Sequence, residues 1–76
     1  MSDQDYMAAL GPKIQAKRNA LGLTQAEVAE VLNVSLSAVS NWEAGSAVIG
    51  APMLARLEAY FRQCAKAQGK TVQVLA

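Results

Sequence analysis

The sequence predicts an all-α domain. Hydrophobic residues recur at helical spacing through the middle of the chain, and residues that favour helix ends stand at the borders of these segments. The chain has 76 residues, which suits one small domain. A chain of this length buries only about 60% of the surface that its unfolded form exposes, so a partner subunit would help to stabilise it.

The first predicted helix begins at Gly11 and Pro12, because proline needs no amide hydrogen in the first turn of a helix. Residues 2–10 are interpreted as a polar and then apolar lead-in. An apolar side of this helix is formed by Leu10, Ile14 and Leu21, with the methylenes of Lys17 beside it. Gly22 is predicted to end the helix.

Thr24 and Glu27 form the pattern of a capping box, in which each side chain bonds to the backbone amide of the other residue. Leu23 stands where a hydrophobic staple packs. Inward positions of the helix that follows are Val28, Ala29 and Leu32. The sequence therefore predicts a helix with one buried and one solvated side.

Asn33 tolerates the left-handed conformation that ends a helix, and Ser35 offers an oxygen that caps the next one. The turn between the two helices is thus about three residues long. In the second of these helices Ala38, Val39 and Trp42 point inward, and Gly45 ends it. We interpret Trp42 as a core residue rather than a platform for stacked bases.

A last helix is predicted to start at Pro52, to pack through Leu54, Leu57 and Phe61, and to reach Gly69. The tail 71–76 alternates and is rich in β-branched residues, which favours a strand. A lone strand needs a partner, so we expect Thr71, Val72 and Val74 to pair with a second subunit in a homodimer. The alternative is a frayed chain end.

Together, residues 21–29, Val34-Ser35 and the segment Val39-Ser40-Asn41-Trp42-Glu43-x-Gly45 resemble the Cro/C1 (XRE-type) helix-turn-helix family. The resemblance covers residues 10–61. It implies a five-helix lambda-repressor-like DNA-binding domain over residues 1–76, with the helix-turn-helix at 24–44 and a C-terminal extension at 65–76. It also implies a sequence-specific transcriptional regulator, a repressor, whose partner is double-stranded DNA. The C-terminal strand weakly resembles that of helix-turn-helix antitoxins.

The same resemblance assigns roles to individual residues. The helix at 35–44 would lie in the major groove, with base contacts from Leu36, Ser37, Ser40 and Asn41. Phosphate contacts would come from Gln25 and Ser35 at helix N-termini, with Lys13 and Lys17 as nearby cations. Arg18 and Glu43 match a family pair that joins the first helix to the end of the recognition helix, and we interpret this pair as structural.

The distribution of charge argues against strong DNA binding. Net charge is only +1. The segment from Asn19 to Ala55 contains no lysine or arginine, but it contains three glutamates, Glu27, Glu30 and Glu43. Family members often carry cations in the loop after the recognition helix, which here reads Ser46-Ala47-Val48-Ile49. Most DNA binders have a basic face. We therefore expect a shallow dependence of DNA affinity on salt.

A second hypothesis makes the domain a protein-binding module, such as an antitoxin that masks a toxin, with DNA binding secondary. Its basis is the apolar pair Val48-Ile49, which either covers the core or meets a partner protein such as a toxin or another regulator. In that case replacing both residues with serine should abolish the complex and leave the fold intact.

Several other classes of protein are disfavoured. The chain has one cysteine, Cys64, and no histidine, which argues against disulfide scaffolds and the commonest zinc sites, and we expect no metal or cofactor. No nucleophile has a histidine base, so an enzyme is not expected. The longest apolar stretch, residues 47–55, is interrupted by Gly50 and Pro52, which argues against a membrane span. Without a recognisable secretory signal, we expect a cytoplasmic protein.

Overall fold

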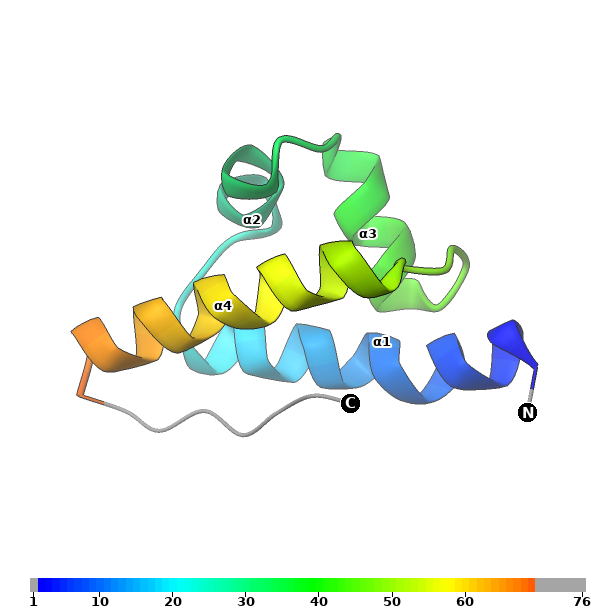
Figure 1. The fold of residues 1–76 in the computed structure, drawn as a ribbon, viewed down its shortest axis with the longest axis horizontal. Helices are drawn as coiled ribbons and strands as arrows, with labels where there is room; N and C mark the ends of the chain where they lie inside the picture. The colour runs from blue at the N-terminus through cyan, green and yellow to red at the C-terminus, as the bar shows by residue number, and fades with distance from the viewer. Residues whose placement is uncertain (1, 70–76) are drawn as a thin grey trace.

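Four helices account for most of residues 2–69, the part of the chain that the computed structural model describes (Figure 1). They are α1 (Asp3–Ala20), α2 (Gln25–Leu32), α3 (Leu36–Ala44) and α4 (Ala51–Ala67). In the view of Figure 1, α1 and α4 run in the same direction across the lower half, and α2 and α3 lie above them. The prediction of an all-α fold is confirmed for these residues.

One cluster of buried side chains joins the four helices. α1 packs against α3, and α2 packs against both α3 and α4. The fully buried members with the largest side chains are Phe61, Met7, Ile14, Leu57, Val28 and Val39. The predicted inward positions of α2 and α4 are confirmed, because Val28, Ala29, Leu32, Leu54, Leu57 and Phe61 are all buried. At the far end of α4, the Gln68 side chain donates to the carbonyl of Leu21 over 2.8 Å, which ties α4 to the end of α1.

The predicted start of the first helix is wrong. α1 begins at Asp3, because the Ser2 hydroxyl accepts the amide hydrogen of Asp5 as an N-cap and the Met7 side chain is buried in the core. Pro12 therefore lies inside the helix, where it cannot donate to the carbonyl of Ala8. Both residues are exposed, so water can hydrate that carbonyl. Burial of Met7 outweighs the local signal of Gly11-Pro12.

Gly11 has a role that its sequence context does not suggest. A Cβ atom at this position would lie 2.6 Å from the carbonyl oxygen of Trp42 and 2.7 Å from that of Glu43. Contacts this short with backbone atoms require one element to move. The missing side chain therefore lets the backbone of α1 approach the C-terminal end of α3.

We expect Gly11→Ala to lower the free energy of unfolding by about 1–3 kcal/mol, because the steric clash outweighs the gain in helix propensity of about 1 kcal/mol. Urea denaturation followed by circular dichroism measures this change. Gly50→Ala is the matched control, since its Cβ would meet only Pro52 Cδ, at 3.9 Å. A smaller loss in Gly11→Ala than in Gly50→Ala would contradict the close approach of α1 and α3.

The five helices expected from the resemblance are not found in residues 2–69. The lead-in merges with α1, and the segment after Pro52 is one unbroken helix that ends at Ala67 rather than at Gly69. The predicted C-terminal strand, with its dimer residues Thr71, Val72 and Val74, lies outside the described residues.

The structure also separates the two residues of the proposed protein-binding patch. Ile49 is only 2% exposed and belongs to the core, whereas Val48 is 50% exposed. The expectation that serine at both positions would leave the fold intact is therefore wrong, because a serine at position 49 would put a hydroxyl into the core. Of the two residues, only Val48 therefore offers apolar surface to a partner.

Candidate nucleic-acid interface

The start of α2 is fixed by the capping box that the sequence predicts. The Glu27 amide donates to Thr24 Oγ1 over 3.1 Å, and the Thr24 amide donates to Glu27 Oε1 over 3.3 Å. These bonds satisfy two amides that an uncapped helix would leave without partners. The first turn of α2, which includes Gln25, is thereby held in one place.

The turn between α2 and α3 also follows its local sequence. Asn33 adopts a left-handed conformation with φ of 58°, and the Val34 amide donates to the carbonyl of Ala29 over 3.0 Å. Ser35 Oγ then accepts the amide hydrogen of Ala38 over 3.1 Å and caps α3. This turn sets α3 at a steep angle to α2 (Figure 1).

α3 presents a neutral side to solvent. Val39, Trp42 and Glu43 are buried on its inner side, and Leu36 at its first position is 53% exposed. The other exposed residues of this helix are Ser37, Ser40, Asn41 and Ala44. The four residues predicted to contact bases are thus brought together on one outer surface of α3, which carries apolar and hydrogen-bonding groups without a formal charge.

A buried polar cluster holds α3 against α1 and α2. Arg18 Nε donates to Glu43 Oε2 over 2.7 Å, and Nη2 donates to Glu43 Oε1 over 3.0 Å, so the pair is bidentate. Arg18 Nη1 donates to the carbonyl of Leu23 over 2.8 Å. Arg18 is 9% and Glu43 is 6% exposed. The hydrogen bond to Glu43 raises the pKa of the Arg18 guanidinium above its usual value, so the guanidinium stays charged.

Gln25 joins this cluster, which sequence reasoning missed. Its Nε2 donates to Glu43 Oε1 over 3.0 Å, and the side chain is half-buried rather than fully turned to solvent. The start of α2, the last turn of α1 and the end of α3 are therefore linked through one carboxylate. No local pattern could reveal this contact, because Gln25 and Glu43 are separated by 18 residues.

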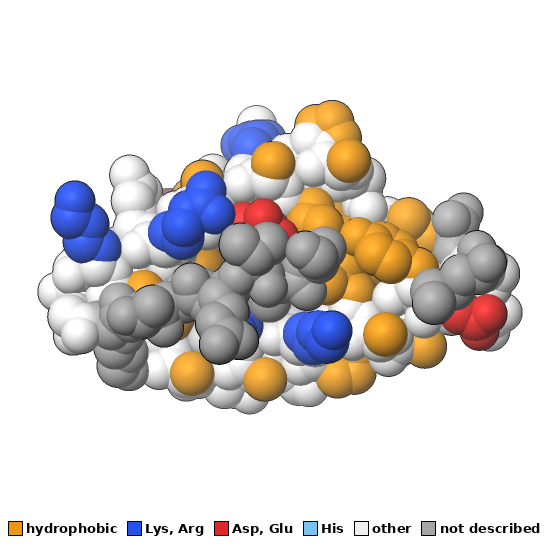
Figure 2. Space-filling model, turned by 60° about the horizontal axis from the view of Figure 1, so that its bottom comes forward, with side chains coloured by type: hydrophobic (Ala, Val, Ile, Leu, Met, Phe, Trp, Pro, Cys, Tyr) orange, Lys and Arg blue, Asp and Glu red, His pale blue; other side chains and the backbone are white. Residues whose placement is uncertain are grey.

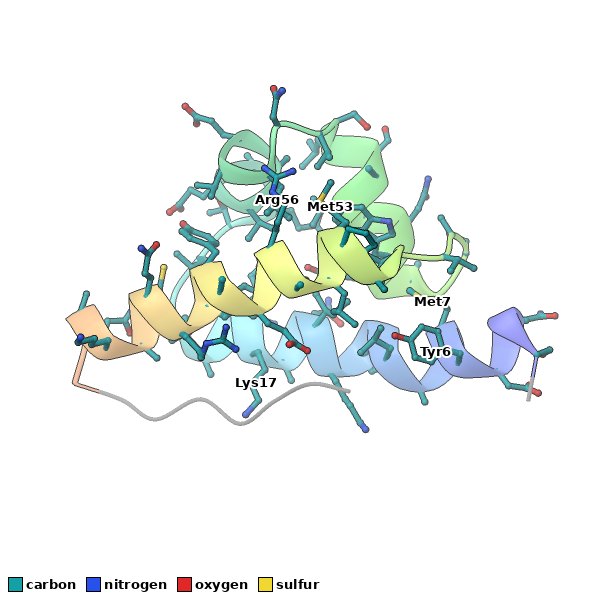
Figure 3. The ribbon with its side chains drawn as sticks, viewed as in Figure 1. Tyr6, Met7, Lys17, Met53 and Arg56 are labelled. Carbon is teal, nitrogen blue, oxygen red and sulfur yellow. The ribbon has the colours of Figure 1, made fainter. Side chains whose placement is uncertain are left out.

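Lys13 and Lys17 do not lie beside the exposed surface of α3. Lys17 points away from α2 and α3 in the view of Figure 3. Lys13 precedes it by one helical turn and therefore shares its side of α1. Figure 2 shows the Lys and Arg side chains of this face separated from one another, without a continuous basic surface. The structure thus does not bring these two predicted phosphate contacts near Leu36 and Asn41.

Ser46 is a further polar residue next to the predicted base contacts. Its hydroxyl lies 3.3 Å from the carbonyl oxygen and 3.4 Å from the side-chain oxygen of Asn41, and its amide donates to the same carbonyl over 2.9 Å. Gly45, with φ of 77°, makes the turn that returns the chain to Asn41. A serine shortly after a C-terminal glycine is the only sequence signal for this contact.

The fold and this surface define a helix-turn-helix protein of the kind that binds DNA. A family model described as helix-turn-helix matches residues 14–67, which is most of the chain, so the protein belongs to the Cro/C1-type helix-turn-helix family. No curated protein and no solved structure matches the chain with significant similarity. Membership in this family makes the protein a DNA-binding transcription regulator.

Residues 2–69 contain neither a candidate membrane span nor a candidate metal site. No helix in this part of the chain is both long and apolar enough to cross a membrane. Within the same residues, no group of three or more histidine, cysteine, aspartate or glutamate side chains gathers in a way that suits a metal ion.

Proposed function

We propose that this regulator recognises a specific DNA sequence by placing α3 in the major groove, with base contacts from Leu36, Ser37, Ser40 and Asn41. The observation that carries the proposal is the uncharged outer surface of α3, on which the large apolar side chain of Leu36 is 53% exposed. An exposed helix with hydrogen-bonding side chains has the shape that the major groove accepts.

The chemistry of this surface favours A·T base pairs. The Asn41 carboxamide can bond to N6 and N7 of adenine, and the Leu36 side chain can pack on a thymine methyl group. Guanine is read mainly by arginine or lysine and cytosine by carboxylates, and none of these stands on the outer surface of α3. We therefore expect A·T pairs at the centre of each half-site.

Phosphate contacts would come from helix N-termini rather than from cations. The partial positive charge at the start of α2 and of α3 attracts phosphate, and Ser35 adds a hydroxyl there. Gln25 has two amide hydrogens and donates one to Glu43, which leaves the second for a phosphate oxygen. This arrangement offsets the lack of lysine and arginine between Asn19 and Ala55.

We further propose that the regulator is a repressor that binds as a homodimer. A domain bound across a promoter excludes polymerase without further contacts, which makes repression the simplest consequence of binding. Two-fold symmetry would place two half-sites about one helical turn, or roughly 34 Å, apart. The pairing of residues 71–76 between subunits remains our prediction for the origin of this dimer.

The test of this function compares Asn41→Ala with Gln63→Ala on a selected DNA site. A duplex enriched from a randomised library is labelled, and binding is followed by fluorescence anisotropy. Asn41→Ala should weaken binding by about 1–3 kcal/mol, because one bidentate base contact is lost. Gln63→Ala removes an exposed carboxamide from α4 and should leave the affinity unchanged.

Three outcomes would count against the proposal. If no sequence is enriched from the library, the domain does not read DNA sequence under these conditions. Equal affinities of wild type and Asn41→Ala would remove α3 from the contact surface. Enrichment of G·C pairs in the half-site centre would overturn the predicted base preference while leaving sequence-specific binding intact.

A further inference from the structure

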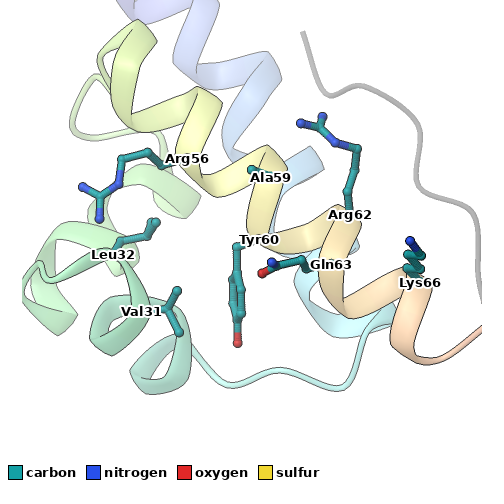
Figure 4. A pocket seen from close by; sticks show the side chains of 8 residues that line it. All are labelled: Val31, Leu32, Arg56, Ala59, Tyr60, Arg62, Gln63 and Lys66. Carbon is teal, nitrogen blue, oxygen red and sulfur yellow. The ribbon is translucent and has the colours of Figure 1, made fainter.

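A groove runs between the C-terminal half of α2 and the outer side of α4 (Figure 4). Its volume is about 520 Å³, and its apolar lining includes Val31, which is 47% exposed, and the half-buried ring of Tyr60. Burial raises the pKa of Tyr60 to about 12, with a smaller effect of a hydrogen bond to Cys64, so the phenol is uncharged at neutral pH. We call this feature the α2–α4 groove.

Positive charge is concentrated along this groove. Arg56, Arg62 and Lys66 line it, and they are three of the six lysine and arginine residues that the structure describes. No carboxylate belongs to the lining. Glu27, one turn before Val31, affects Tyr60 electrostatically, but its carboxylate is engaged in the capping box of Thr24. The only ion pair within residues 2–69 is Arg18–Glu43, so the three cations have no carboxylate partner there.

We propose that the α2–α4 groove binds an acidic segment of a partner protein. Carboxylates of that segment pair with Arg62 and Lys66, and an apolar side chain rests on Val31 and Tyr60. A protein segment supplies both groups, since acidic and apolar side chains alternate readily along a short peptide. The three cations of the groove call for a negatively charged partner. The apolar lining calls for a partner that also carries an apolar side chain.

The position of the groove favours a protein over DNA as its occupant. Arg62 and Lys66 lie on the half of α4 that extends past α2 and away from α3 (Figures 1 and 4). A DNA backbone at this groove would offer phosphates to the cations but no apolar side chain that could pack on Val31. This second surface therefore leaves the exposed side of α3 available, and the inference does not depend on the proposed DNA contacts.

The length of the groove sets the length of the probe. Arg56 and Lys66 are ten positions apart on α4, which corresponds to about 15 Å along the helix axis. An extended peptide of about five residues spans that distance. We therefore choose a synthetic peptide of roughly eight residues, six glutamates with two central leucines, and a control peptide with glutamines in place of the glutamates.

The experiment titrates the full chain, labelled with nitrogen-15, with each peptide and follows the backbone amides by nuclear magnetic resonance. The acidic peptide should shift amides of residues 31, 32 and 56–66, and the glutamine peptide should not. The double variant Arg62→Gln with Lys66→Gln should bind the acidic peptide at least roughly ten-fold more weakly. Lys13→Gln with Lys17→Gln removes the same charge outside the groove and should bind within about two-fold of wild type.

Every other outcome overturns the inference. Equal weakening in both double variants would mean that the peptide is attracted by net charge alone. Shifts scattered over the surface, or none in the groove, would remove the groove as a binding site. If a random-sequence DNA duplex shifts the same amides and displaces the peptide, the groove is a nucleic-acid surface instead.

Discussion

Replacement of Glu43 by alanine is expected to lower the free energy of unfolding by about 3–5 kcal/mol, because it leaves the Arg18 guanidinium buried without its counter-ion. The Arg18 side chain is only 10% exposed, so water can solvate little of its charge. A 76-residue domain has a total stability of roughly 4–11 kcal/mol. Urea denaturation should therefore show a variant that has lost a large share of its stability.

The control for this prediction removes both charges at once. Arg18→Met combined with Glu43→Leu leaves no buried ion and fills similar volume, so it should regain most of the stability that Glu43→Ala loses. A loss below about 1 kcal/mol in Glu43→Ala would instead place the pair among solvent-screened surface salt bridges. That result would also weaken the view that this carboxylate fixes α3 relative to Gln25.

Features set by neighbouring residues could be predicted from the sequence. The capping box of Thr24 and Glu27, the left-handed turn at Asn33 and the cap at Ser35 each depend on residues within three positions, and the structure confirms all of them. The inward sides of α2 and α4 could also be predicted, because burial follows the helical period.

Features set by distant residues could not be predicted from local patterns. The start of α1 depends on the burial of Met7 under the loop after α3, and the short contact of Gly11 depends on the carbonyl of Trp42. The pair Arg18–Glu43 spans 25 positions and could be expected only through family resemblance. The α2–α4 groove could likewise not be predicted from the sequence, since its lining residues come from two separate helices.

The two adjacent aromatic residues of α4 allow the stability of the domain and the proposed function of the groove to be tested separately. Phe61 is the largest of the fully buried side chains, whereas Tyr60 is half-buried at the groove. Adjacent residues of an α-helix are about 100° apart around its axis, so the two rings face different surfaces of α4. Their centroids are 6.4 Å apart, and the ring planes are tilted by 35°. Truncation of each residue should therefore affect a different property.

Phe61→Ala should lower the free energy of unfolding by about 3–5 kcal/mol, because it removes a buried ring and leaves a cavity. Tyr60→Ala should cost less, since its ring is already partly hydrated, yet it should weaken binding of the acidic peptide. Thermal denaturation and the amide titration measure these two properties separately. Equal losses of stability in the two variants would mean that α4 packs in a different rotation, and Tyr60 would then no longer define the groove.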